Sequence, residues 1–104
     1  MTDLDPAHEI ETAPDEVLLS TMDIGDQAEK FIASELGQVL LAIAKQEADN
    51  ALQKLKDVSA WDQKAILELQ SRVWRAESFN GWLASLVFKG REAYSEFRDR
   101  KGEE

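Results

Sequence analysis

Apolar residues recur every three or four positions along most of this chain, and that spacing places them on one face of a helix rather than on alternate sides of a strand. The pattern therefore predicts an all-α fold. From Asp26 to about Lys56 the chain contains no Pro, and we expect one long helix there. Its apolar stripe comprises Ile32, Leu36, Val39, Leu40, Ile43, Ala44, Ala51 and Leu55.

A second helix is predicted after a short break at Asp57, Val58 and Ser59. Ser59 is a suitable N-cap, because an acid, Asp62, follows it three residues later. Since only a few residues link the two helices, we expect a long antiparallel helical hairpin. The second helix carries a regular seam with spacings of three and four, formed by Ile66, Leu69, Val73, Ala76, Asn80, Leu83, Val87, Gly90 and Tyr94.

The dipeptide Asn80-Gly81 is the ambiguous point of the second helix. Asn-Gly is a common turn signal, and a turn here would divide the region into two helices of a three-helix domain. The seam keeps its phase across the dipeptide, so the pattern favours one continuous helix. A polar residue such as Asn80 within a seam can fix the register and the oligomeric state of paired helices, or it can point out of a kink.

The first 24 residues differ from the rest of the chain in charge. They contain seven acidic residues and no Lys or Arg, which predicts an acidic arm. The segment from Thr12 to Glu16 offers an N-cap, an early Pro and first-turn acids, so we expect a short helix there, ended by a break at residues 23–26. The predicted parts are thus residues 1–24, an acidic arm with a short helix, and residues 25–104, a helical hairpin domain.

The apolar face of the second helix is too wide for a two-helix hairpin to cover. It spans roughly 160–200° around the helix, and Trp74 and Phe88 fall outside it on the far side. The arm helix, a second copy of the chain or a larger protein must cover this surface, unless an intramolecular three-helix core does so. The candidate interface residues are Leu18, Leu19, Trp74, Phe79, Asn80, Trp82, Leu86, Phe88 and Phe97.

Composition limits the classes of function. The 104 residues include 21 acidic and 12 basic side chains and no Cys, with a net charge of −9. This length suits one small domain without a deep catalytic pocket. Between residues 72 and 101, seven basic residues outnumber four acidic ones, so the arm can dock on its own chain, on a neighbouring subunit or on a basic partner. A solvated tail is the alternative.

The usual sets of catalytic and ligating residues are missing from the sequence. His8 is the only His and lies in the acidic arm, no Glu-x-x-His pair occurs, and the five glycines are isolated. We therefore predict a protein that is not an enzyme, with no catalytic residue, cofactor, metal or evident small-molecule substrate. A pI near 4.6 opposes nucleic-acid binding. No membrane span is expected, and the N-terminus carries acids where a signal peptide carries Lys or Arg.

Four segments resemble small helical structural proteins of tailed bacteriophages: GQVLLAIA at 37–44, ADNAL at 48–52, LQSRVWRAESFNGWL at 69–83 and GREAY at 90–94. The similarity covers residues 26–97. It implies a virion-associated or assembly role in many symmetric copies, and a location in the host cytoplasm or in the virion.

The sequence as a whole predicts a helical structural or assembly protein, which forms a homo-oligomer or docks on a larger protein complex. The alternative is a small acidic regulatory or inhibitor protein that binds a host protein through its N-terminal arm.

Overall fold

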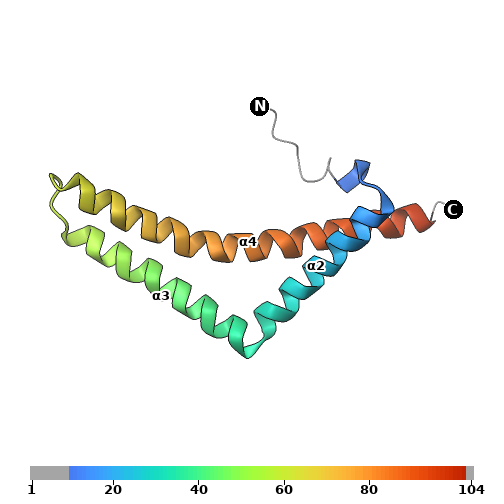
Figure 1. Ribbon diagram of the computed structural model, residues 1–104, viewed down its shortest axis with the longest axis horizontal. Helices are drawn as coiled ribbons and strands as arrows, with labels where there is room; N and C mark the ends of the chain where they lie inside the picture. The colour runs from blue at the N-terminus through green and yellow to red at the C-terminus, as the bar shows by residue number, and fades with distance from the viewer. Residues whose placement is uncertain (1–9, 103–104) are drawn as a thin grey trace. The chain divides into compact units, whose positions relative to one another are not determined.

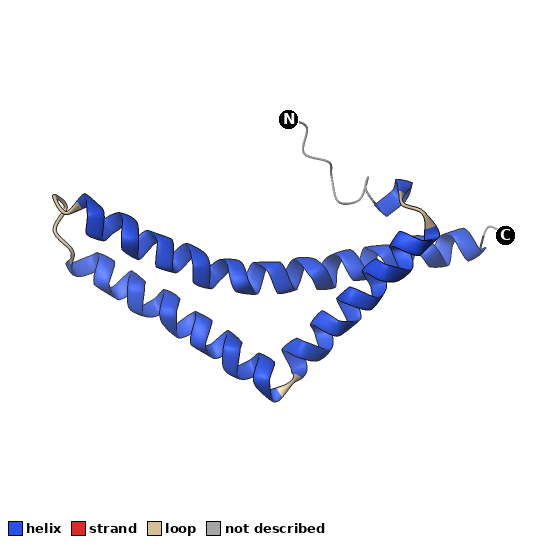
Figure 2. Ribbon diagram, in the orientation of Figure 1, coloured by secondary structure: helices blue, strands red, loops and turns tan. Residues whose placement is uncertain are grey.

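The computed structural model describes residues 10–102, and nearly all of them are helical (Figures 1 and 2). α2 spans Asp15–Ala33, α3 spans Glu35–Asp57 and α4 spans Gln63–Gly102, while residues 10–12 form a helical turn. None of the described residues lies in a strand. The all-α prediction is therefore confirmed, and so is the antiparallel hairpin, which α3 and α4 form.

α2 is longer than the short arm helix predicted from the sequence. It begins after Pro14, whose carbonyl oxygen accepts a hydrogen bond from the Leu18 N–H at 3.1 Å. Asp15 and Glu16 occupy the first turn, where the helix dipole favours negative charge. The break expected at residues 23–26 is absent, since α2 continues through them to Ala33, and Gly25 is buried within the helix. The predicted boundary between residues 24 and 25 therefore falls within a helix.

The break between the first two long helices lies at Ser34. This residue has an extended backbone, with φ −72° and ψ 159°, and its Oγ accepts a hydrogen bond from the Gly37 N–H at 2.9 Å. The bond satisfies one of the unpaired N–H groups at the start of α3. The single helix predicted from Asp26 to Lys56 is therefore wrong in its first third. Its predicted end is confirmed, since α3 ends at Asp57.

α4 starts one turn later than its predicted cap implied. Asp62 is its N-cap, and the Asp62 Oδ1 accepts a hydrogen bond from the Ala65 N–H at 3.1 Å. Ser59 instead shapes the preceding turn, where its Oγ accepts from the Trp61 N–H at 3.3 Å and its carbonyl oxygen from the Asp62 N–H at 3.0 Å. Asp62 is the cap because it directly precedes the first helical residue.

The remaining course of α4 follows the sequence pattern. The helix passes through Asn80 and Gly81 without interruption, which confirms the predicted continuous helix. Up to Gly90 the seam residues are at least partly buried except for Asn80, which is exposed, and beyond Gly90 the seam is wrong. Tyr94 is 55% exposed, whereas its neighbour Ala93 is fully buried. The reason is geometric, since a straight helix of 3.6 residues per turn drifts by ~20° per heptad away from a strict seven-residue repeat.

The chain forms two compact units, which we name by their content. The hairpin unit comprises residues 32–82 and contains α3 with the first half of α4. The terminal unit comprises, among the described residues, 10–31 and 83–102, and contains most of α2 with the second half of α4. In the hairpin unit the buried positions are mostly small: Gly37, Ala48, Ala51 and Leu69.

The terminal unit is built around three buried residues, Ile10, Leu18 and Ala93. Leu18 and Ala93 have no exposed surface. Met22 from α2 and Phe97 from α4 pack against them. The arm helix thus covers part of the wide apolar face of α4, which was the first of the covers expected from the sequence.

α2 and α4 cross in close contact at two glycines. A Cβ added at Gly25 would lie 2.8 Å from the Gly90 Cα and 3.0 Å from the Leu86 carbonyl oxygen. Carbon atoms normally pack at about 3.5–4.0 Å, so a larger residue fits only if the helices separate. Arg91 and Glu29 pair beside this crossing, with the Arg91 Nε 3.0 Å from the Glu29 Oε1. Packing therefore requires Gly25, and the residue does not mark a turn.

Candidate interaction surfaces

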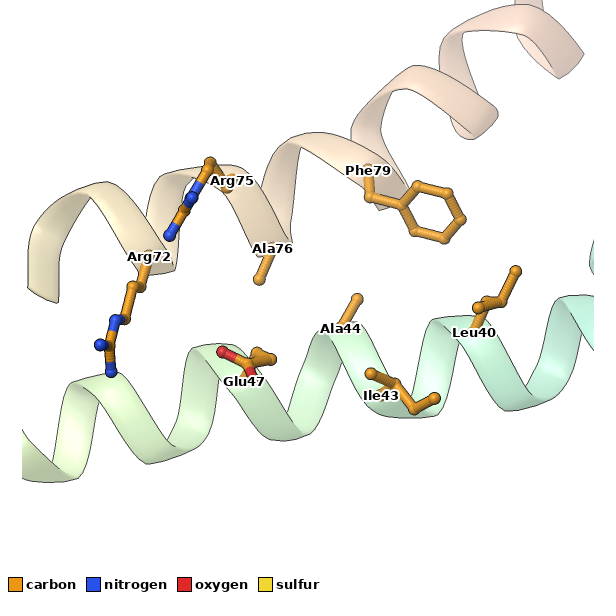
Figure 3. Close-up of a pocket in the computed structure, with 8 residues that line it drawn as sticks. All are labelled: Leu40, Ile43, Ala44, Glu47, Arg72, Arg75, Ala76 and Phe79. Atoms are coloured by element: carbon orange, nitrogen blue, oxygen red, sulfur yellow. The ribbon is translucent and has the colours of Figure 1, made fainter.

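An apolar groove lies between α3 and α4 within the hairpin unit. It has a volume of about 330 Å³, and its apolar lining consists of Leu40, Ile43, Ala44, Ala76 and Phe79. Figure 3 shows Ala44 and Ala76 pointing toward one another, while Leu40 and Phe79 face each other from the two helices. Because the two alanines are short, they leave open space between the helices that larger side chains would fill.

Charged residues border this groove. Glu47 comes from α3, and Arg72 and Arg75 come from successive turns of α4 (Figure 3). Arg72 pairs with Glu68 at 3.1 Å, whereas Arg75 forms no ion pair with any residue that the structure describes. The groove can therefore receive an apolar side chain with an acidic group beside it, as a short acidic and apolar peptide would present.

The hairpin unit keeps its large apolar side chains on the outside. Within residues 32–82, eight of them are between 44% and 93% exposed. The buried apolar residues of this unit are Ala48, Ala51 and Leu69. This distribution reverses the usual preference of large apolar side chains for the interior. The eight residues are Leu36, Val39, Ile43, Leu52, Trp61, Leu67, Trp74 and Trp82.

The structure divides the nine predicted interface residues into three groups. Leu18 and Phe97 belong to the core of the terminal unit, so they stabilise the fold of their own chain. Phe79 is half-buried and lines the groove of Figure 3. The remaining six are exposed: Leu19, Trp74, Asn80, Trp82, Leu86 and Phe88.

Asn80 does not occupy a buried seam position. It is exposed and borders a second cavity of the hairpin unit, together with Leu41 and Leu52. The sequence allows two interpretations of this residue, a position that sets the register of paired helices and a residue that points out of a kink. The helix is continuous at Asn80 and the side chain is accessible, so Asn80 does not fix the packing of α4 on α3 from a buried position, and a role in pairing with another chain stays a prediction.

Arg100 holds the described part of the acidic arm against α4. Its guanidinium donates hydrogen bonds to the Asp15 Oδ1 at 2.9 Å, the Glu11 carbonyl oxygen at 3.1 Å and the Glu96 Oε1 at 3.1 Å. The hydrogen bond with Asp15, followed by that with Glu96, raises the pKa of Arg100 above its usual value. Because a guanidinium is charged at every physiological pH, these contacts do not depend on the protonation of Arg100. For residues 10–15, the arm docks on its own chain.

Sequence reasoning missed the groove, although a signal for it was present. Leu40, Ile43 and Ala44 were assigned to a single inward stripe. The buried apolar residues of α3 are instead Ala48 and Ala51, while Leu40, Ile43 and Ala44 line the open groove. Small residues at spacings of three and four permit a closer helix approach, which leaves the larger neighbours at the rim.

The described residues were also compared with the requirements of a metal site and of a membrane span. Residues 10–102 contain no group of three or more His, Cys, Asp or Glu side chains placed to hold a metal ion. His8 lies outside the described residues. In the same range, no helix is both long and apolar enough to cross a membrane. No protein-family model matches the chain, and no curated protein or solved structure is significantly similar to it.

Proposed function

We propose that this protein is a non-enzymatic helical assembly protein, which self-associates or docks on a larger protein complex through apolar side chains that its own fold leaves exposed. One observation carries the proposal: in the hairpin unit the interior is made mostly of small residues, while eight large apolar residues are at least 44% exposed. Where such side chains form a contiguous patch, the surface is uncommon on monomers and typical of protein interfaces.

The resemblance to structural proteins of tailed bacteriophages supports a more specific role. A virion or assembly component acts in many copies, and each copy must present surface to its neighbours. Trp74 and Trp82 lie in the longest of the four segments, residues 69–83, and both are exposed, at 65% and 62%. Trp is enriched among the residues that dominate binding energy at protein interfaces. We therefore propose a structural subunit of a symmetric assembly.

The mass of the full-length protein in solution tests this proposal directly. Size-exclusion chromatography with light scattering, at low and high salt and at several concentrations, is expected to show a defined oligomer. A protein that stays monomeric at every concentration contradicts self-association. If the unaltered protein forms an oligomer, Trp82→Glu should lower the measured mass, while the helix content by circular dichroism stays the same.

Leu83→Glu is the matched control for Trp82→Glu, because it introduces the same charge one residue further along α4. Leu83 is only partly exposed, so we expect this variant to lose helix content or thermal stability. The opposite ranking, in which Trp82→Glu unfolds the protein and Leu83→Glu does not, would show that the exposed and packed faces of α4 are wrongly assigned.

The alternative function is that of an acidic inhibitor that binds through its arm. Testing it requires a truncation that removes acidic residues of the arm and leaves the core of the terminal unit intact. Deletion of residues 1–24 removes Leu18 from the core of the terminal unit and so disturbs the fold as well as the arm. Deletion of residues 1–9 removes acidic residues without touching Ile10 or Leu18. An inhibitor should lose its target after the shorter deletion, whereas a structural subunit should assemble as before.

A further inference from the structure

A regular stripe runs along the face of α4 that is turned away from α3. It consists of Leu67, Ser71, Trp74, Ser78 and Gly81, at alternating spacings of four and three, and we call it the outer stripe. At 3.6 residues per turn it lies roughly opposite the α4 residues that pack on α3. Leu67 and Trp74 are 64% and 65% exposed. A repeat of this kind is typical of a helix that pairs with another helix.

The outer stripe alternates large and small side chains. Leu67 and Trp74 are the large residues, and Ser71 and Ser78 are the small ones between and after them. If a second copy of α4 lies antiparallel across a twofold axis, Trp74 of each copy faces Ser71 of the other, and Leu67 faces Ser78. A parallel pair would instead place Trp74 against Trp74 and serine against serine, which leaves gaps between the helices.

Charges beside the outer stripe favour one register of this antiparallel pair. Glu68 and Arg75 lie on the same flank of α4, and in the register just described each faces the other residue of the second copy. A shift by one heptad would place Arg75 against Arg75 and Glu77 against Glu77. Like charges in contact disfavour that alternative, so the charge pattern selects a single pairing.

The exposed state of these charged groups is compatible with the pairing. Glu68 uses its Oε1 to bind Arg72 within α4, yet 60% of its side chain remains exposed. Arg75 is exposed and forms no ion pair with the residues that the structure describes. A second copy would therefore supply Arg75 with a carboxylate that its own chain does not.

The available area fits a dimer of modest affinity. A Trp side chain can bury ~150–250 Å², so the exposed part of Trp74 offers roughly 100–160 Å² in each copy. Leu67, Glu68 and Arg75 add to this area at both ends of the twofold pair. The total remains below the ~800 Å² per partner of a standard stable interface, which predicts association that depends strongly on concentration.

We propose that residues 67–78 of α4 form an antiparallel pair with the same residues of a second copy of this chain, held by Trp74 over Ser71 and by Glu68 against Arg75. This inference rests on the proposed function, because it identifies the surface and the partner of self-association. Docking on a different protein would not require Glu68 of one copy to face Arg75 of another, whereas the proposed pairing does.

Charge reversal in the full-length protein tests the pairing. Glu68→Arg places two arginines in the contact and Arg75→Glu places two glutamates there, so each variant alone should dimerise at least ~10-fold more weakly than the original chain. An equimolar mixture of the two variants restores both opposite-charge contacts and should sediment as a heterodimer. Lys54→Glu, an exposed charge reversal on α3, is the control and should leave the mass unchanged.

The outcomes separate this inference from the proposed function. The α4 pairing is overturned if the unaltered chain self-associates and neither single variant weakens that association. It is also overturned if the mixture associates as weakly as its components. The groove lined by Phe79 is then the next surface to test. An unaltered chain that is monomeric at every concentration overturns the α4 pairing and leaves, of the proposed function, only docking on a different protein. Circular dichroism of each variant establishes that helix content is preserved.

A second variant tests the size pattern independently of charge. Ser71→Tyr fills the space over which Trp74 of the second copy would lie, and it should weaken dimerisation at least ~10-fold. Gln53→Tyr adds the same apolar surface to an exposed position of α3 and should have no such effect. If Ser71→Tyr leaves dimerisation unchanged or strengthens it, Trp74 does not lie over Ser71 and the proposed pairing is wrong.

Discussion

Substitution of Gly25 by Ala tests whether the contact between α2 and α4 depends on the absence of a side chain. Ala stabilises the interior of a helix by about 0.5–1 kcal/mol relative to Gly. At this position, however, the new Cβ would lie 2.8 Å from the Gly90 Cα and 3.0 Å from the Leu86 carbonyl oxygen. Both atoms belong to the backbone, so neither moves unless α4 moves. Since carbon atoms pack at about 3.5–4.0 Å, the two helices must separate locally by roughly 1 Å.

The expected magnitude follows from these opposing effects. Overpacking of this kind costs about 1–3 kcal/mol, which is at least as large as the gain in helix propensity and leaves a net loss of up to about 2.5 kcal/mol. Gly81 provides the matched control, because it also lies inside α4 but has no atom within 4 Å of an added Cβ. Gly81→Ala should therefore raise the free energy of unfolding by about 0.5–1 kcal/mol. The two substitutions are expected to differ in sign.

Urea unfolding followed by far-ultraviolet circular dichroism measures both changes. All proteins must be compared at one concentration, since association of the folded state adds to apparent stability. We expect a lower midpoint for Gly25→Ala and also for Gly90→Ala, whose Cβ would lie 2.8 Å from the Gly25 Cα. A Gly25→Ala variant that gains as much stability as Gly81→Ala would refute the close crossing.

Three further predictions concern caps, the arm and association. Asp62→Ala should lower the free energy of unfolding by about 1 kcal/mol, more than Ser59→Ala does, because Asp62 caps α4; urea midpoints in the reverse order would contradict this assignment. Arg100→Gln removes hydrogen bonds to residues 10–15, so amide hydrogen exchange by mass spectrometry should accelerate there but not in α3, and unchanged exchange would show that Arg100 does not hold the arm. The urea midpoint of the unaltered protein should rise with protein concentration, and a constant midpoint would contradict coupled folding and association.

The features of this fold that depend on local pattern could be predicted from the sequence. α4 has 40 residues, and its three-and-four spacing outweighs the turn signal of Asn80-Gly81 because no side chain or proline interrupts the hydrogen-bond ladder there. The end of α3 at Asp57 was also predictable, since the apolar period stops and the charged residues Lys54 and Lys56 fill the last turn.

The features that depend on contacts between helices could not be predicted in this way. Gly25 reads as a helix breaker between two aspartates, and only the proximity of Gly90 shows that a residue without a side chain is needed there. Ser34 has N-cap chemistry, yet Ile32, Leu36 and Leu40 continue the apolar period across it, so periodicity alone conceals the break. The groove could not be predicted for the same reason, because periodicity does not show which of two adjacent stripes on α3 packs against α4.

The placement of large and small residues connects the fold with the proposed function. Full burial of a side chain such as Leu contributes about 1.5–3 kcal/mol, while a buried Ala contributes far less. The hairpin unit nevertheless buries Ala48 and Ala51 and leaves Trp74 and Trp82 mostly exposed. For an isolated monomer this arrangement sacrifices the strongest available source of stability. In a subunit of an assembly, Trp74 and Trp82 would become buried on contact with a neighbouring protein, and their burial would then stabilise the assembly. The small alanines let α3 and α4 approach closely, which fixes the helix that carries the two Trp residues.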